Sequence, residues 1–82
     1  MDRRILRFTA SWCGPCKTIA QQLEELNVQM PIEVIDIDVF SDVAMDYGIR
    51  SVPTLIILEG NVEVKRKVGV TTKEILKNWI EA

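Results

Sequence analysis

One short segment, residues 54–58, constrains the fold more than any other part of the sequence. It reads Thr-Leu-Ile-Ile-Leu, an apolar run with the length of a strand and no alternation with charged residues. Such a run predicts a central strand that is buried on both faces. A chain of 82 residues has room for one domain only. We therefore expect residues 1–82 to form a single domain in which helices cover a sheet that contains this strand.

Three further segments have the pattern of strands. Residues 5–9 are apolar with one charge, and residues 32–39 alternate in part, which predicts a half-buried strand. A tight turn is expected at residues 59–61. After it, residues 62–68 alternate three valines and an arginine with glutamate and lysine. This alternation predicts an outer antiparallel strand, whose lysines discourage pairing with other sheets.

Helical spacing of apolar residues begins at Cys16, and Asn27 can end this first helix. Ser41 is expected to cap a short second helix that ends at Gly48.

A third helix is expected near the end of the sequence. Thr71 and Glu74 have the spacing of a capping box. The expected apolar face of this helix consists of Ile75, Leu76, Trp79 and Ile80.

The element order is then βαβαββα, which predicts an α/β fold. Two strand–helix–strand units with right-handed crossovers should give a parallel core. The final hairpin should add an antiparallel edge. The expected result is a four-stranded mixed sheet flanked by three helices.

The composition excludes several classes of function. A net charge of −2 with 48% hydrophobic residues is not typical of a disordered chain. Lys and Arg are scattered apart from one cluster at residues 65–67, which predicts no nucleic-acid partner. No apolar stretch approaches the roughly 18–20 residues of a membrane span, and residues 1–5 lack the apolar segment of a secretory signal. We expect a cytoplasmic protein with no membrane partner.

The two cysteines, Cys13 and Cys16, stand three positions apart. A disulfide between them would close a tiny loop and constrain little of the unfolded chain, so they are not structural staples. A structural zinc site usually has four ligands, and the sequence has no histidine and no carboxylate flanking the pair. Zinc shared between two chains stays open. We expect no metal and no cofactor and interpret the pair as redox-active, the alternative being two inert cysteines.

The two thiols should play different roles. Cys13 follows a strand and starts a helix, where free N–H groups and the helix dipole favour an anion and so lower the thiol pKa. Cys16 lies one turn further in and should point back toward Cys13 and be more buried. We therefore expect Cys13 to attack a substrate disulfide and Cys16 to resolve the mixed disulfide.

The residues around this pair resemble the thioredoxin family. Residues 12–17 read Trp-Cys-Gly-Pro-Cys-Lys and resemble its active-site motif; residues 47–55 resemble its second landmark, and Gly69 resembles the glycine beside its active site. The resemblance extends from Ile5 to the last helix. It implies a thioredoxin-like fold that lacks the N-terminal strand and helix of full-length thioredoxins.

The resemblance also implies a cis bond between Val52 and Pro53. Proline has no N–H, so it can lie against the sulfurs while the backbone of Val52 pairs with an extended substrate segment. A mostly flat apolar rim around Cys13 would suit a protein disulfide. The expected rim consists of Trp12, Gly14, Pro15, Val52, Pro53, Gly69 and Val70. Trp79, in contrast, is expected in the core.

Arg7 departs from the family pattern. It stands where thioredoxins usually carry a buried aspartate, and Val34 stands where they carry its partner lysine, so the usual proton acceptor for Cys16 is absent. A nearby positive charge would lower both thiol pKa values, and proton transfer from Cys16 would rely on water or on Cys13. Arg7 should either pair with Asp36 or extend to solvent.

These features predict a monomeric protein-disulfide reductase that carries electrons and maintains cell redox homeostasis. Its expected partners are disulfide-containing proteins and an NADPH- or ferredoxin-linked thioredoxin reductase. A glutaredoxin-like, glutathione-dependent reductase is one alternative, with Lys17 or Arg50 holding a glutathione carboxylate. A thioredoxin-like accessory binding subunit is another. An oxidase or isomerase is disfavoured by Gly14 and Pro15, because strongly oxidising relatives carry other dipeptides.

Overall fold

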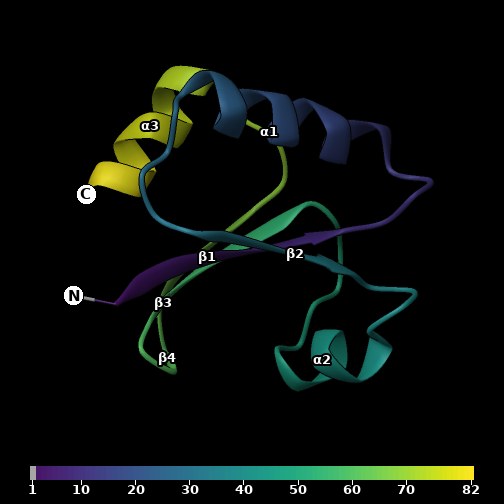
Figure 1. Ribbon diagram of the computed structural model, residues 1–82. Helices are drawn as coiled ribbons and strands as arrows, with labels where there is room; N and C mark the ends of the chain where they lie inside the picture. The colour runs from purple at the N-terminus through teal and green to yellow at the C-terminus, as the bar shows by residue number, and fades with distance from the viewer. Residues whose placement is uncertain (1) are drawn as a thin grey trace.

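The computed structural model describes residues 2–82, and Met1 of the N-terminal segment considered above lies outside the described residues. The elements are β1 (Arg3–Thr9), α1 (Gly14–Glu25), β2 (Ile32–Asp36), α2 (Ser41–Asp46), β3 (Thr54–Glu59), β4 (Val62–Val68) and α3 (Lys73–Glu81) (Figure 1). This order and the four-stranded mixed sheet with three helices confirm the predicted fold class. Within residues 2–82, no helix has both the length and the hydropathy needed to cross a membrane.

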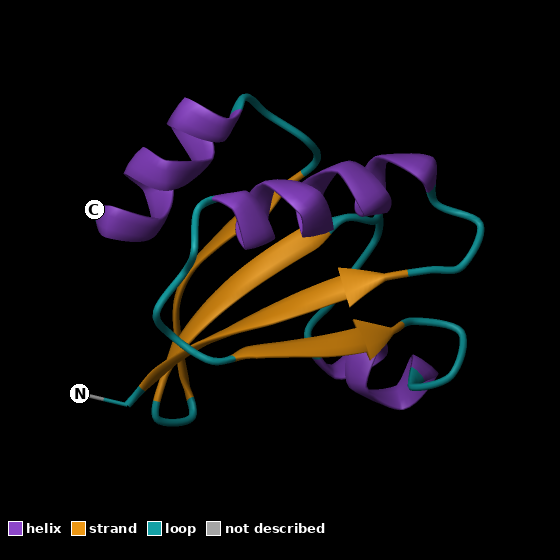
Figure 2. Cartoon of the chain, turned by 45° about the horizontal axis from the view of Figure 1, so that its top comes forward, coloured by secondary structure: helices purple, strands orange, loops and turns teal. Residues whose placement is uncertain are grey.

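The sheet has the strand order β2-β1-β3-β4 (Figure 2). β1 and β2 are parallel, β3 is antiparallel to β1, and β4 is antiparallel to β3. The prediction of a parallel core is therefore wrong for the second strand–helix–strand unit, β2-α2-β3, whose two strands run in opposite directions. The reason is the length of α2, which has six residues and, at about 1.5 Å per residue, cannot carry the chain back along β2. β3 consequently starts at the end of the sheet where β2 stops.

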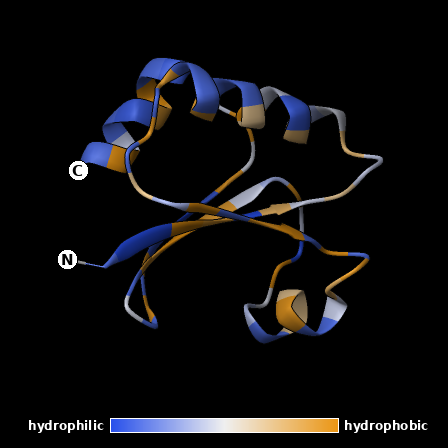
Figure 3. Cartoon of the chain, in the orientation of Figure 1, coloured by the Kyte–Doolittle hydropathy of each residue, from blue (hydrophilic) through white to orange (hydrophobic). Residues whose placement is uncertain are grey.

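The helices form two layers around the sheet. α1 and α3 cover one face and α2 lies on the other (Figures 1 and 2). Figure 3 shows hydrophilic residues on the outer sides of α1 and α3. The cluster beneath α1 and α3 consists of Ile5, Ile19, Leu23, Leu55, Ile57 and Leu76. The cluster on the α2 face consists of Leu6, Phe8, Ile35, Ala44, Ile56 and Leu58. Both faces of β3 are thus buried, as its unbroken apolar run predicts.

α1 begins two residues earlier than its apolar spacing predicts. Cys13 is its N-cap, and Pro15 lies in the first turn, where the missing N–H costs no hydrogen bond. Asn27 follows the C-cap with a φ of 52°, a left-handed conformation that Asn tolerates better than most residues.

The two other predicted caps are each wrong by one residue. Phe40, not Ser41, is the N-cap of α2, and its side chain makes no capping hydrogen bond. Thr72, not Thr71, caps α3, with its hydroxyl oxygen accepting from the N–H of Ile75. Ile75 itself is half exposed rather than part of the apolar face.

The edge strand β4 has its lysines partly buried and its valines exposed. The side chain of Lys65 crosses to α3, where Nζ donates to the carbonyl of Ala82 at 2.8 Å and to that of Trp79. The same ammonium lies 5.3 Å from the centre of the Trp79 ring. Trp79 is partly buried and packs against the cluster beneath α1 and α3. Lys65 therefore binds the last turn of α3 to the edge of the sheet.

Candidate active site at the start of α1

Cys13 and Cys16 form a disulfide at the N-terminus of α1, with their Cα atoms 5.4 Å apart. The N–H of Cys13 donates to the carbonyl of Ala10 at 3.1 Å and closes the turn between β1 and α1. The Cys13 sulfur accepts from the N–H of Cys16 at 3.2 Å. It therefore occupies the place that a capping oxygen takes in other helices, at the positive end of the helix dipole.

The two cysteines differ little in burial. Cys13 is 4% exposed and Cys16 is 2% exposed, and both pack with Ala10, Ile37 and Val52. Cys16 is more buried than Cys13, as expected, but in this oxidised form the difference in exposed fraction is slight. Hydrogen bonding distinguishes the two sulfurs, because Cys13 holds the N-cap position and Cys16 lies inside the first turn.

The second landmark lies directly against the pair. The peptide bond between Val52 and Pro53 is cis, which confirms the expectation. The carbonyl oxygen of Val52 is 3.7 Å from the Cys13 sulfur. The carbonyl of Pro53 accepts from the N–H of Gly69 at 2.9 Å. Gly69 has a φ of +86°, which L side chains rarely adopt. The cis-proline turn and the end of β4 are thus fixed to each other beside the cysteines.

The expected rim residues differ in exposure. Trp12 is 68% exposed, so it is not a core tryptophan. Gly14, Pro15 and Val70 are also exposed, Val52 and Gly69 are half-buried, and Pro53 is buried. The structure brings the three segments that contain these residues together at one end of the sheet, around Cys13.

Trp12 is held by a contact that no local sequence pattern indicates. Its indole N–H donates to the carboxylate of Asp38 at 2.9 Å. Asp38 lies in a turn because β2 ends at Asp36, three residues earlier than predicted. The carboxylate of Asp36 accepts from the N–H groups of Asp38 at 2.8 Å and Val39 at 3.4 Å. An aspartate directly after a strand is a signal for such a turn.

Arg7 is half-buried and, within the described part of the chain, forms no ion pair, so of the two expected placements the pairing with Asp36 is not seen. Burial lowers the pKa of its guanidinium. Arg7 lines a cavity of about 230 Å³ together with both cysteines, Lys17 and Asp36. It also lines an adjoining cavity of about 420 Å³ with Val34, its register partner on β2.

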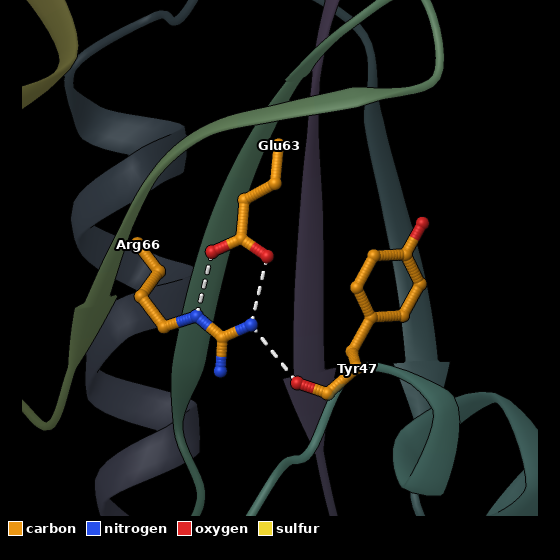
Figure 4. Close-up of polar contacts among 3 residues, drawn as sticks. All are labelled: Tyr47, Glu63 and Arg66. Carbon is orange, nitrogen blue, oxygen red and sulfur yellow. Dashed lines mark hydrogen bonds and ion pairs between the residues drawn. The ribbon is translucent and has the colours of Figure 1, made fainter.

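Residues 47–53, which lead from α2 to the cis proline, are held at their start by a side chain of β4. Arg66 donates from Nε and Nη2 to both carboxylate oxygens of Glu63, at 2.7 and 2.8 Å, and from Nη2 to the carbonyl of Tyr47 at 2.9 Å (Figure 4). The hydrogen bond from Arg66 lowers the pKa of Glu63, and the carboxylate raises the pKa of Arg66. Because Tyr47 is the C-cap of α2, this ion pair fixes the start of the segment that ends at Pro53.

Comparisons with known proteins agree on one family. The thioredoxin family model matches residues 1–82. The chain is 43% identical over 77 residues to thioredoxin of Bacillus subtilis (strain 168), covering 89% of this chain and 74% of that protein. It is 37% identical over 76 residues to a bifunctional thioredoxin reductase/thioredoxin of Mycobacterium leprae (strain TN), covering 88% of this chain and 17% of that protein.

Solved structures give the same result. An N21Q mutant thioredoxin from Halobacterium salinarum NRC-1 matches with a TM-score of 0.87 and 35% identity, over 98% of this chain and 73% of that one. The oxidised thioredoxin from Plasmodium falciparum matches with a TM-score of 0.84 and 34% identity, over 98% of this chain and 79% of that one.

Proposed function

The chain belongs to the thioredoxin family, and from this premise we propose that it carries electrons from a thioredoxin reductase to disulfides in other proteins. As a family member with the Cys13–Cys16 pair, it is a thiol–disulfide oxidoreductase with protein-disulfide reductase activity. The observation that carries the proposal is the position of the Cys13 sulfur, which caps α1 and lies beside the cis-proline turn.

In the proposed mechanism, reduced Cys13 acts as a thiolate. Its sulfur forms a bond with one sulfur of the substrate disulfide, and the other substrate sulfur leaves as a thiolate. The Cys16 thiolate then attacks the Cys13 sulfur, which forms the Cys13–Cys16 disulfide and releases the second substrate thiolate. Two electrons pass to the substrate. The N–H of Cys16, which faces the Cys13 sulfur, stabilises the negative charge before attack.

The rim would receive the chain that flanks the substrate disulfide. Its proposed members are Trp12, Gly14, Pro15, Val52, Pro53, Gly69 and Val70. Val52 is half-buried, and its backbone would pair with an extended substrate segment.

The cavity beside the cysteines supports a route for the proton that Cys16 loses. Asp36 is the one carboxylate among the residues that line it, and Arg7 and Lys17 line it too. Asp36 would accept the proton in place of the buried aspartate of other thioredoxins. The two cations would favour the thiolate forms of Cys13 and Cys16.

The electron donor, the location and the assembly state belong to this proposal. A relative whose name joins thioredoxin reductase to thioredoxin favours a thioredoxin reductase, NADPH- or ferredoxin-linked, as the donor. Residues 1–82 would act as one monomeric domain in electron transport. A cytoplasmic location fits a disulfide that is reduced in every cycle.

The test is a pair of insulin-reduction assays, one with thioredoxin reductase and NADPH and one with glutathione. We expect turnover with the reductase, none in Cys13→Ser, and a trapped mixed disulfide in Cys16→Ser. Turnover with glutathione alone would instead support a glutaredoxin-like reductase. Partner binding that persists in a double-serine variant, without reduction by the wild type, would support an accessory subunit.

A further inference from the structure

We propose that Val39 and Phe40 extend the docking surface beyond the rim and bind an apolar segment of the protein whose disulfide Cys13 attacks. This inference rests on the proposed function and adds a specificity determinant to it. We call these two residues the 39–40 pair.

Within the described residues, the side chains of the 39–40 pair belong to no core cluster and make no capping hydrogen bond. Val39 is 69% exposed and Phe40 is 53% exposed, and neither belongs to an apolar cluster of the core. Phe40 is the N-cap of α2, a position where Ser, Thr, Asp or Asn would bind free N–H groups, and it makes no such bond. Two adjacent large apolar side chains that lie outside the core clusters, are more than half exposed and do not cap the helix are typical of an interaction surface.

The 39–40 pair is continuous with the active site. Asp38, the residue before it, accepts the hydrogen bond from the indole of Trp12, and Trp12 directly precedes Cys13. Because β1 and β2 are parallel, the loops that follow them leave the sheet at the same end (Figures 1 and 2). Figure 3 shows the apolar stretch between β2 and α2 at this end. Through its hydrogen bond to Asp38, Trp12 thus connects the segment of Cys13 to the turn that carries the exposed side chains of Val39 and Phe40.

The turn that carries the 39–40 pair is fixed rather than loose. The carbonyl of Asp36 accepts from the N–H groups of Val39 at 3.2 Å and Phe40 at 2.8 Å, in addition to the bonds made by its carboxylate. A surface held in this way loses little conformational entropy when a partner binds. The occupant that fits is a substrate segment with apolar side chains, held here while its disulfide lies over Cys13.

The test compares a protein disulfide with a small one. The double variant Val39→Thr/Phe40→Asn keeps the shape at position 39 and places a good N-cap residue at position 40. The substrates are insulin and the small disulfide DTNB, each mixed with pre-reduced protein. Val62→Thr is the matched control, because Val62 is equally exposed, at 69%, and lies in the hairpin at the opposite end of the sheet.

We expect the second-order rate constant for insulin reduction to fall about fivefold in the double variant, as burial of two partly exposed apolar side chains predicts, with the DTNB rate and thermal stability retained. The control should match the wild type with both substrates. An unchanged insulin rate in the double variant would overturn the proposal. An equal loss with both substrates would also overturn it, by assigning the pair a structural role.

Two further outcomes separate this proposal from its premise. Failure of the wild type to reduce insulin would overturn the proposed function itself. Sedimentation that shows a wild-type dimer and a monomeric double variant, with insulin reduction unchanged, would assign the 39–40 pair to self-association and overturn substrate docking.

Discussion

The sulfur of Cys13 and the carbonyl oxygen of Val52 lie 3.7 Å apart, although 39 positions separate the two residues in the sequence. This approach places the attacking sulfur between the N-terminus of α1 and the cis-proline turn. Under the proposed function, a substrate segment that reaches Cys13 passes along the backbone of Val52. The proposed function depends on these neighbours of the sulfur and on the charged residues around them.

Replacing Arg7 with methionine should raise the pKa values of both cysteine thiols. Arg7 shares a cavity with the two cysteines, and removing a cation from it disfavours their thiolate forms. Ultraviolet titration of the thiolates in the reduced protein measures the change. Arg7→Lys keeps the positive charge, so both thiol pKa values in this variant should stay close to those of the wild type. If neither thiol pKa rises in Arg7→Met, Arg7 has no electrostatic role in the reaction.

Asp36→Asn should slow the second step of the reaction and leave the first intact. Asparagine retains the oxygen that accepts the N–H groups of Asp38 and Val39, so the turn should persist. It cannot accept the proton from Cys16 as a carboxylate does. Rapid-quench measurement of the mixed disulfide should show its accumulation near pH 7. Mixed-disulfide decay as fast as in the wild type would exclude Asp36 as the acceptor.

Glu63→Gln should destabilise the protein near neutral pH by less than about 1 kcal/mol, since the ion pair with Arg66 is largely exposed. The folded-state pKa of Glu63 lies below its ordinary value, so its contribution is present above the unfolded-state pKa and is lost as the pH falls through the folded-state value. Urea unfolding at pH 7 and pH 3 measures this. The wild type and the variant should converge at pH 3, and a constant difference at both pH values would contradict the assignment.

Much of the fold follows from local sequence patterns, and the exceptions have physical reasons. The burial of β3 was predictable because an apolar run without alternation has few other solutions. The direction of β3 relative to β1 was not, because it depends on the length of α2 and the turn before it. The cap at position 72 was not predictable, since adjacent Thr71 and Thr72 offer the same hydroxyl. The cap at position 40 was not predictable either, because the phenylalanine there makes no side-chain capping bond.

The site was predictable where its residues are close in sequence or match a family landmark, as for Cys13, Cys16 and Pro53. The hydrogen bond between Trp12 and Asp38 spans 26 positions, and no local pattern indicates which carboxylate an exposed indole will reach. The surroundings of Arg7 also depend on tertiary packing. Arg7 lines two cavities formed by several elements of the fold and has no single ion-pair partner among the described residues.

The most direct test of the central claim is the pH dependence of iodoacetamide alkylation of the reduced protein, with each cysteine followed by mass spectrometry. We predict that Cys13 reacts first and that its rate rises at a pH well below the ordinary thiol pKa of about 8.5. Cys16 should remain protected, and unfolding in guanidinium should remove the difference. Two cysteines in the folded protein that both react as slowly as free cysteine at neutral pH would contradict a thiolate held at the start of α1.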